Sequence, residues 1–247
     1  MLKKWNIDFS YPKPVLLIEH LIRVFSQNSG DAILDFFAGS GTTGHATFRA
    51  NARDGKTRRF VLVQLPEPVE RGSIADITVK RLQCAGAQVK DENLDKTIDV
   101  GFRVYKLATS NLKPWQPDAE DLEASILDAV DNVLPGRTED DLLVKLLLKT
   151  GIDLTLPEEK RGVAGQTVYA LGGGTLIVCL GNVGADSAEA VSQGIADWVS
   201  ELDPVQTTVY FKDTGLGTNG NRAATKANLA AILRQRLGDR IAKIASI

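Results

Sequence analysis

A glycine-rich stretch, DFFAGSGTTGHA over residues 35–46, contains the residue types that point most directly to chemistry. Residues 39–44, GSGTTG, match the pattern G-x-G-x-x-G letter for letter. Where this pattern follows a strand and opens a helix, its glycines let the backbone approach a bound ligand closely. We therefore expect the loop to hold a ligand, although the pattern alone also fits a tight turn that binds nothing.

The residues around the loop distinguish between three kinds of candidate ligand. A nicotinamide site usually has an acidic residue at the end of the second strand, where this chain has Gln64, with Glu67 shortly after it. A phosphate-binding P-loop needs Gly-Lys-Ser/Thr, whereas here Thr42 follows Gly41. Asp35, at the end of the first strand, would repel a pyrophosphate. It suits a ligand with an ammonium group, such as the methionine part of S-adenosylmethionine.

The elements that must position this loop follow the order of a parallel α/β sheet. Pro12 and Pro14 hold the chain extended before a helix whose apolar residues recur at helical spacing. The predicted elements are a helix at 15–27, a strand at 32–37, a helix at 40–51, a strand at 58–65 and a helix at 74–86 closed by Gly86. Strand, helix, strand and helix in this order are typical of a parallel sheet.

The composition changes near residue 98, which divides the chain into residues 1–98 and residues 99–247. The predicted elements of the second part are a strand at 100–107, a loop at 111–118, helices at 119–133 and 138–151, a hairpin at 166–181 turning on residues 172–174, a helix at 187–202, a strand at 207–213, a helix at 224–239 and a strand at 241–247. Both parts are therefore expected to be α/β.

Composition and charge exclude several classes of protein. The 247 residues are 43% hydrophobic and carry a formal net charge of −2, which does not suggest a free-standing nucleic-acid-binding domain. Cys84 and Cys179 form neither a disulfide framework nor a zinc pattern, so no metal is expected. No apolar run is long enough to cross a membrane and no signal peptide is recognisable, which favours a cytoplasmic protein.

Several stretches of the sequence resemble one family of enzymes. DFFAGSGTTGHA resembles the cofactor motif of the β-class amino-methyltransferases, and the preceding FSYPKPVLLIEHLI resembles their Lys-Pro motif. Four further stretches resemble the modification subunit of type III restriction systems: RRFVLVQLPEP, SIADITVKRLQCAG, DVGFRVYKLATSNLKPW and LLLKTGIDLTLP. The resemblance implies an incomplete methyltransferase-like parallel sheet, formed by residues 1–98, followed by a smaller α/β domain over residues 99–247. It also implies transfer of a methyl group from S-adenosylmethionine to the exocyclic amine of a flipped adenine in DNA.

The same resemblance implies which residues bind the cofactor. Lys13 and Pro14 would lie beside its methionine end, where Lys13 neutralises the carboxylate. Gln64 stands where the class has an acidic residue that binds the ribose, and Glu67 is the alternative. The residues expected to line the pocket are Asp35, Phe36, Phe37, Ala38, Gly39, Ser40, Gly41, Thr42 and Thr43.

One motif of the class is missing from these residues. The catalytic Asp/Asn/Ser-Pro-Pro-Tyr/Phe motif does not occur, and YPKP and LDPV are the nearest strings. The chain is therefore expected to be the C-terminal part of such an enzyme, with no catalytic residue assigned and no activity alone. Its expected partners are DNA, through the complete enzyme, and either a second copy or the missing methyltransferase half with a restriction subunit. A non-catalytic assembly module with a vestigial pocket, or a nicotinamide-dependent oxidoreductase, are the alternatives.

Three expectations concern packing. The strand at 32–37 would have an unpaired edge, which we expect residues 99–247 or a second copy to cover, because bare edges promote aggregation. His45 follows the glycine loop and is expected to pack or to face solvent rather than to catalyse. The two cysteines are expected to be buried apolar residues.

Overall fold

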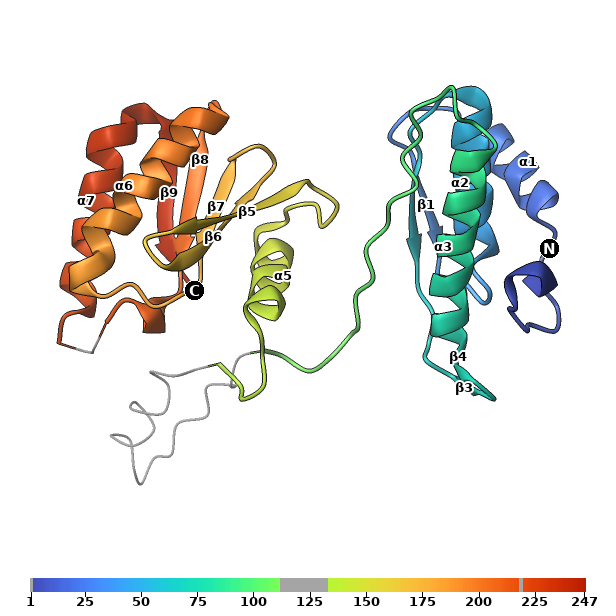
Figure 1. Cartoon of the computed structure of the whole chain (residues 1–247), viewed down its shortest axis with the longest axis horizontal. Helices are drawn as coiled ribbons and strands as arrows, with labels where there is room; N and C mark the ends of the chain where they lie inside the picture. The colour runs from blue at the N-terminus through green and yellow to red at the C-terminus, as the bar shows by residue number, and fades with distance from the viewer. Residues whose placement is uncertain (1, 112–132, 218–219) are drawn as a thin grey trace. The chain divides into compact units, whose positions relative to one another are not determined.

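The chain forms two compact units, which the computed structural model describes over residues 2–111, 133–217 and 220–247. The first unit is Met1–Lys106 and the second is Leu107–Ile247; they are the blue-to-green and the yellow-to-red parts of Figure 1. Val100 and Phe102 pack against the core of the first unit. The chain therefore leaves this unit later than the change of composition near residue 98. The roles of the two parts stay predictions.

The first unit contains three main helices and a parallel pair of strands. Its elements are η1 (Leu2–Trp5), α1 (Val15–Phe25), β1 (Ala32–Asp35), α2 (Thr42–Asp54), β2 (Arg59–Leu62), β3 (Pro68–Val69), β4 (Gly72–Ser73) and α3 (Ile74–Asp91). β1 and β2 are parallel, with Ala32 opposite Arg59 and Asp35 opposite Leu62. The predicted order of strand, helix, strand and helix is confirmed, and the fold class is α/β.

The β1–β2 sheet is covered on one face within this unit. On that face, Phe60 and Leu62 pack against a core from α2 and α3 that includes Phe48 and Leu82. The opposite face is apolar and exposed, and we call it the open face. Its residues are Leu34, Val61, Val63 and Leu65, which are 63%, 53%, 50% and 66% exposed. Parallel sheets are ordinarily buried on both faces, so the open face is unusual.

Two predictions about α3 and the chain after it are wrong. The helix does not end at Gly86 but continues to Asp91. A Cβ atom at Gly86 would lie 3.2 Å from Cβ of Val100, so this glycine allows the returning chain to pack closely rather than ending the helix. Residues 100–107 form no strand. Val100 and Phe102 are apolar because they pack on the core of the first unit. Val104, which continues the alternation, is 62% exposed.

The second unit is a five-stranded mixed sheet with helices on both faces. Its elements are α5 (Glu139–Thr150), β5 (Glu158–Val163), β6 (Gln166–Leu171), β7 (Leu176–Cys179), α6 (Ala185–Leu202), β8 (Thr207–Phe211), η2 (Asp213–Gly215), α7 (Arg222–Leu237), η3 (Gly238–Arg240) and β9 (Ile241–Ser246). The strand order is β5-β6-β7-β8-β9. β5, β6 and β7 are antiparallel, whereas β7, β8 and β9 are parallel.

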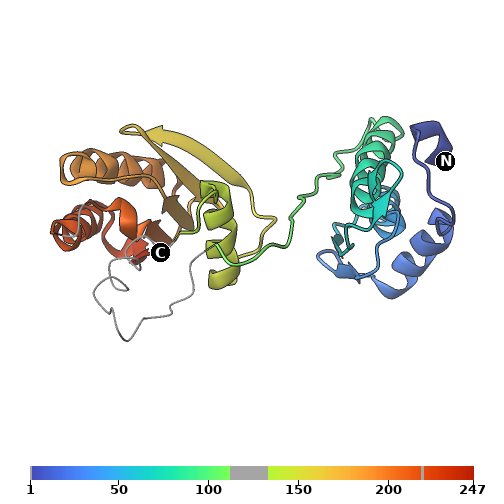
Figure 2. The ribbon, with the colours of Figure 1, turned by 90° about the horizontal axis from the view of Figure 1, so that it is seen from below.

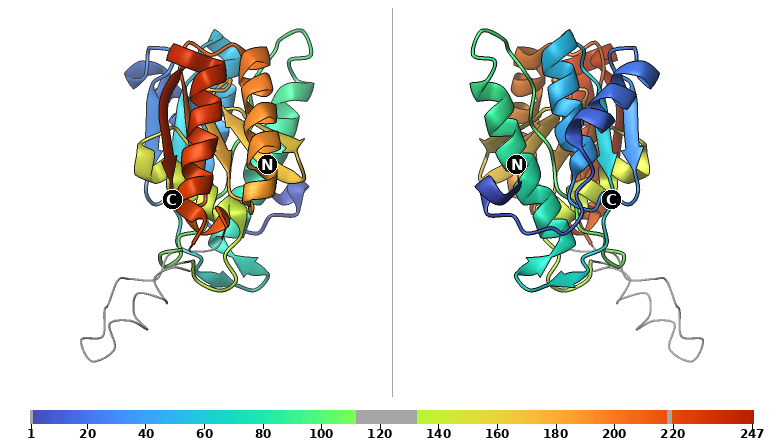
Figure 3. Two further views of the ribbon diagram at one scale, coloured as in Figure 1. Left: turned by 90° about the vertical axis from the view of Figure 1, so that its left-hand side faces the viewer. Right: turned by 90° about the vertical axis from the view of Figure 1, so that its right-hand side faces the viewer.

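The two faces of this sheet have separate cores. α6 and α7 lie side by side on one face (Figures 2 and 3), where Trp198 and Leu233 join the core. α5 covers the other face with Leu142 and Leu146. The hairpin turning on residues 172–174 is confirmed, and all three glycines have positive φ. The edge strand β5 was not predicted, because its sequence EEKRGV is charged and mostly exposed.

Some predictions fall outside the described part of the chain. The loop at 111–118 lies outside it beyond Asn111, and the helix at 119–133 lies outside it except for Val133. The helix at 138–151 is confirmed as α5, with Thr138 as its N-cap. Among the helices of the described residues, none combines the length and the apolar character that a membrane span requires.

Candidate functional site

The glycine loop, which we define as residues 36–41, joins the carboxyl end of β1 to the first turn of α2. Gly39 and Gly41 have φ of 54° and 76°, a left-handed conformation that side chains disfavour. A Cβ atom at Gly41 would also lie 3.0 Å from Cγ2 of Thr78 on α3. Glycine is therefore required at Gly41 by its backbone angles and by the close approach of α3. The first turn of an α-helix has backbone N–H groups without partners inside the helix, and such groups favour negative charge.

Asp35 fixes the beginning of the glycine loop. Its Oδ1 accepts a hydrogen bond from the backbone N of Phe37 at 3.1 Å, and its Oδ2 accepts one from Oγ1 of Thr43 at 2.5 Å. The carboxylate thus links β1 to α2 across the loop. Each carboxylate oxygen can accept a further hydrogen bond, so Asp35 keeps the capacity to bind an ammonium group.

Gly39 is held on both sides of its peptide backbone. Oε1 of Gln64 accepts a hydrogen bond from the N of Gly39 at 2.8 Å, and Oγ1 of Thr78 donates one to its carbonyl at 2.6 Å. Nε2 of Gln64 donates to the carbonyl of Leu65 at 3.1 Å. Gln64 therefore anchors the loop, whereas Glu67 is exposed beyond β2. Which of the two would contact a ribose stays a prediction.

Arg81 lies beneath the second half of the loop. It is 1% exposed, and its Nη1 donates to Oγ of Ser40 at 2.6 Å and to Oγ1 of Thr42 at 2.8 Å. Nη1 also lies 3.5 Å from the carbonyl oxygen of Ser40. Ser40 and Thr42 are buried with their side chains turned toward Arg81, so a ligand on the exposed side would meet mainly their backbone. Ala38 is buried as well.

His45 is fully buried in the first turns of α2, in accord with a packing role. Burial, followed by the positive charges of Arg81, Arg49 and Lys4, lowers the pKa of His45 to about 3. The imidazole is therefore neutral at neutral pH, and its ring centroid lies 5.6 Å from that of Trp5. Neither ring nitrogen has a hydrogen-bond partner among the described residues.

The segment before α1 also reaches the glycine loop. Cζ of Phe9 lies 3.6 Å from the position of a Cβ atom on Gly39, so the Phe9 ring packs against the loop backbone. Pro14 is the N-cap of α1, and Lys13 is exposed just before it. Phe36 and Phe37 are 62% and 81% exposed, with ring centroids 5.1 Å apart. They present aromatic surface beside the loop.

The arrangement is suited to binding and orienting a ligand. It offers backbone N–H groups, one carboxylate and exposed aromatic rings, and the described residues contain no cluster of His, Cys, Asp and Glu able to hold a metal. Three residues that contact the loop, Phe9, Thr78 and Arg81, are not among the site residues predicted from the sequence. The helical spacing of Thr78, Arg81, Leu82 and Ala85 places an arginine on the buried face of α3, and this could have indicated Arg81.

The chain is similar to known proteins of DNA methylation and of restriction-modification systems. Residues 2–69 match the family of DNA methylases. The chain is similar to the Mod subunit of the type III restriction-modification enzyme StyLTI of Salmonella typhimurium (strain LT2), with 33% identity over 125 residues, 47% of this chain and 18% of that protein. It is also similar to the Mod subunit of the type III enzyme EcoP15I of Escherichia coli, with 30% identity over 211 residues, 82% of this chain and 31% of that protein.

A third similarity is to the type II methyltransferase M.KpnI of Klebsiella pneumoniae, with 37% identity over 83 residues, 30% of this chain and 20% of that protein. The resemblance to type III modification subunits that the motifs predict is thus confirmed. The chain spans less than a third of the length of each of these three relatives.

Proposed function

We propose that this chain binds S-adenosylmethionine at the glycine loop, as part of an adenine-specific DNA methyltransferase of a type III restriction-modification system. The observation that carries the proposal is the anchored loop, with Asp35 at the carboxyl end of β1 and the loop backbone fixed by Gln64, Thr78 and Arg81. The match of residues 2–69 to DNA methylases and the similarity to Mod subunits support it.

The residues present fit such a cofactor. Asp35 would accept from the ammonium group of its methionine part, and the free N–H groups at the start of α2 would face its carboxylate. Lys13 and Pro14 lie in the segment that Phe9 packs onto the loop. Bound S-adenosylmethionine supplies a methyl group on a sulfonium, which a nearby amine can attack directly. The task of this chain is to bind and orient, which brings the reacting groups into line.

The proposal includes a catalytic part outside these residues. The Asp/Asn/Ser-Pro-Pro-Tyr/Phe motif that would hold the target adenine is absent from them, so the chain alone is expected to be inactive. The open face gives a physical reason to expect association, because a parallel sheet is normally covered on both faces. We propose that a methyltransferase part bearing the motif, or a second copy of the chain, covers it. DNA and a restriction subunit would be further partners of the complete enzyme.

The two rival functions predict different ligands. A nicotinamide-dependent oxidoreductase would have to place a pyrophosphate near Asp35, where two negative charges repel each other. A non-catalytic assembly module would bind neither cofactor. The four loop anchors argue against it, since a vestigial pocket has no need of a loop held at Asp35, Gln64, Thr78 and Arg81.

Photochemical crosslinking distinguishes these functions. Ultraviolet irradiation of the chain with S-adenosylmethionine labelled on its methyl group should attach label within residues 35–43, and unlabelled S-adenosylhomocysteine should prevent it while NAD should not. Methyl transfer to adenine in duplex DNA should appear only after addition of a polypeptide that carries the catalytic motif. No labelling would contradict the proposal; binding of NAD by the same chain would then favour the oxidoreductase, and binding of neither cofactor would favour the assembly module.

A further inference from the structure

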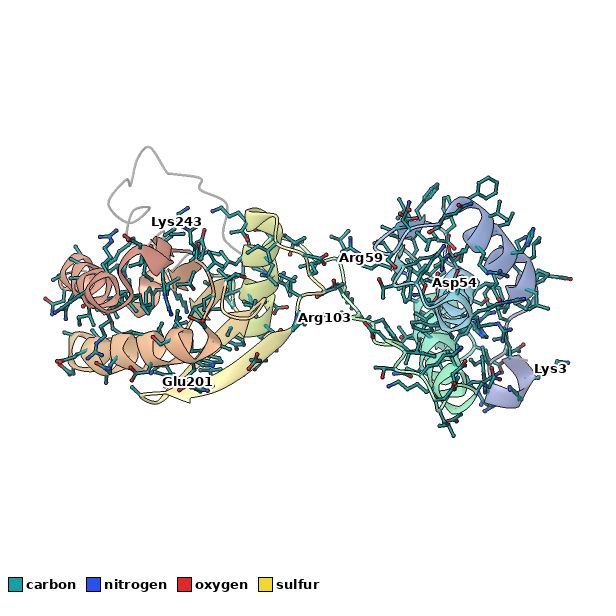
Figure 4. All side chains as sticks on the ribbon, turned by 90° about the horizontal axis from the view of Figure 1, so that it is seen from above. Lys3, Asp54, Arg59, Arg103, Glu201 and Lys243 are labelled. Atoms are coloured by element: carbon teal, nitrogen blue, oxygen red, sulfur yellow. The ribbon has the colours of Figure 1, made fainter. Side chains whose placement is uncertain are left out.

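Arg81 is a buried positive charge whose partners are neutral. Among the described residues, its guanidinium donates to Ser40 and Thr42, and its Nε has no hydrogen-bond partner. The second buried arginine near this sheet, Arg58, is 4% exposed and forms an ion pair with Asp54 at 2.7 Å; Figure 4 labels Asp54 on α2. Burying a charge is costly unless an opposite charge compensates it. The charge of Arg58 is compensated by Asp54, whereas the described hydrogen bonds of Arg81 are to neutral groups.

Arg81 nevertheless remains charged at neutral pH. Burial lowers the pKa of Arg81 to about 10, which is still well above 7. Its charge lies directly under Ser40 and Thr42, where the positive end of the α2 dipole also lies. The two sources of positive potential therefore coincide at the start of α2.

The opposite end of the glycine loop carries negative charge. Asp35 closes β1, and its bonds to Phe37 and Thr43 keep the carboxylate beside the loop. The loop thus has a fixed anion at its β1 end and a fixed cation under its α2 end. This order of charges is complementary to a zwitterion, such as the amino-acid part of a ligand.

We infer that Arg81 is a positioning residue that makes the glycine loop selective for a ligand carrying a carboxylate, acting through Ser40 and Thr42. The inference rests on the proposed function and adds a specificity determinant to that site. Each hydroxyl accepts from Arg81, and the two hydroxyl oxygens lie 3.5 Å apart, so one of them donates to the other and the second keeps its hydrogen. The bonds to Arg81 hold in place the backbone of Ser40 and Thr42, which a ligand on the exposed side would meet, so the charge acts on the ligand across this backbone and without direct contact.

The test compares two probes that differ in one charged group. S-adenosylhomocysteine carries an ammonium group and a carboxylate, and its decarboxylated analogue keeps only the ammonium group. Calorimetric dissociation constants for both, measured at low salt with the full chain, give a ratio that reports recognition of the carboxylate. A purely structural role of Arg81 would change both constants by the same factor and leave the ratio unchanged.

Three variants separate charge from anchoring. Arg81→Met should reduce the preference for the carboxylate-bearing probe about tenfold, the effect of losing one nearby charge in a partly buried site. Arg81→Lys keeps the charge but shortens the side chain and loses the planar guanidinium that holds Nη1 against Ser40 and Thr42, so both affinities should fall and the ratio should persist. Arg58→Met is the matched control, because it removes a buried arginine away from the loop and should leave the ratio unchanged.

Thermal unfolding followed by circular dichroism verifies that each variant folds. If Arg81→Met does not unfold cooperatively, Thr42→Val replaces it, and this variant should reduce the ratio about threefold by breaking one of the two hydroxyl links. Equal weakening of both probes in Arg81→Met, or in Thr42→Val, overturns the inference and leaves the proposed function standing. Binding of neither probe by the wild-type chain overturns the proposed function itself, and the inference with it.

Discussion

At the scale of single residues, His45 shows how burial changes the chemistry of a side chain. The sequence gives a histidine directly after a glycine loop, a place where a catalytic base could stand. The structure buries it completely and leaves both ring nitrogens without partners among the described residues. Its neutral form is therefore part of the folded state, and protonation opposes folding.

We expect the free energy of unfolding to fall as the solution is acidified, because of His45. Its pKa is about 6.5 when unfolded and about 3 when folded. The unfolded state therefore binds the proton first, and stability is lost as the pH falls from 6.5 toward 3. The loss should reach about 2 kcal/mol between pH 7 and pH 5.

Urea unfolding at several pH values measures this dependence. The fall between pH 7 and pH 5 should be markedly smaller in His45→Leu, which also removes two unpartnered polar atoms. His20→Gln is the control, because it removes the chain's other histidine at an exposed position on α1. An identical pH dependence in the wild type and His45→Leu would refute this explanation.

Gln64 gives a second prediction at this scale. Gln64→Leu removes the acceptor of the Gly39 N–H group and should lower the free energy of unfolding by about 1–2 kcal/mol. It should also weaken binding of S-adenosylhomocysteine, because the loop loses one anchor. Chemical denaturation and calorimetry measure the two effects. Glu67→Gln, at an exposed position, should change stability by less than about 0.5 kcal/mol; equal effects of the two variants would be inconsistent with this role.

Part of the candidate site can be predicted from the sequence. The left-handed glycines and Asp35 follow from the pattern of letters, since each is tied to its immediate neighbours. Thr78 and Arg81 could not be placed this way, because their contacts with Gly39 and Ser40 join residues far apart in the chain. Ser40 and Thr42, expected in the pocket from the resemblance, have their side chains hydrogen-bonded to Arg81, and their place in a cofactor pocket stays a prediction.

At the scale of elements, Gly44 sets the distance between α2 and its neighbours. A Cβ atom at Gly44 would lie 2.6 Å from Cδ2 of Leu82 on α3 and 3.1 Å from Cδ1 of Leu62 on β2. The third glycine of the G-x-G-x-x-G pattern therefore serves close packing rather than ligand contact. The loop and the packing behind it depend on the same short stretch of sequence.

Gly44→Ala should destabilise the first unit by about 1–3 kcal/mol, because the clash with Leu82 outweighs the better helix propensity of alanine. Thermal and urea unfolding measure the change. The double variant Gly44→Ala with Leu82→Ala should show a smaller loss than the sum of the two single losses, since removing Leu82 relieves the clash. Simple additivity would show that the clash is not the cause.

Most elements could be predicted because their periodicity matches how they pack. The helices of the first unit and the hairpin of the second have apolar residues where the core requires them. The strand predictions were wrong in two places for physical reasons. β5 is an edge strand with a charged sequence, and the apolar alternation at 100–107 reflects packing on α3 rather than pairing in a sheet.

At the scale of the whole molecule, the open face is the feature that relates the fold to assembly. It exposes Leu34, Val61, Val63 and Leu65 on a parallel sheet that is otherwise well packed. The second unit has apolar cores on both faces of its sheet, made with α6 and α7 on one side and α5 on the other. The first unit therefore has an apolar sheet face that its own described residues do not cover.

Val61→Lys should block association with a polypeptide carrying the catalytic motif, and should also reduce self-association of the chain. It should leave the melting temperature of the chain nearly unchanged, because Val61 is 53% exposed within its unit. Sedimentation velocity measures the association and calorimetry the melting temperature. Unchanged association, or a large loss of stability in the isolated chain, would contradict the proposed role of the open face.

The central claim is that the glycine loop of this chain is a preformed site for S-adenosylmethionine. The most direct measurement is a calorimetric titration of the chain with S-adenosylhomocysteine, with NAD titrated in parallel and Asp35→Ala as the variant. We predict saturable binding of S-adenosylhomocysteine, no binding of NAD, and a loss of affinity of about tenfold or more in Asp35→Ala. Binding of NAD, absence of S-adenosylhomocysteine binding, or an affinity unchanged by Asp35→Ala would contradict the claim.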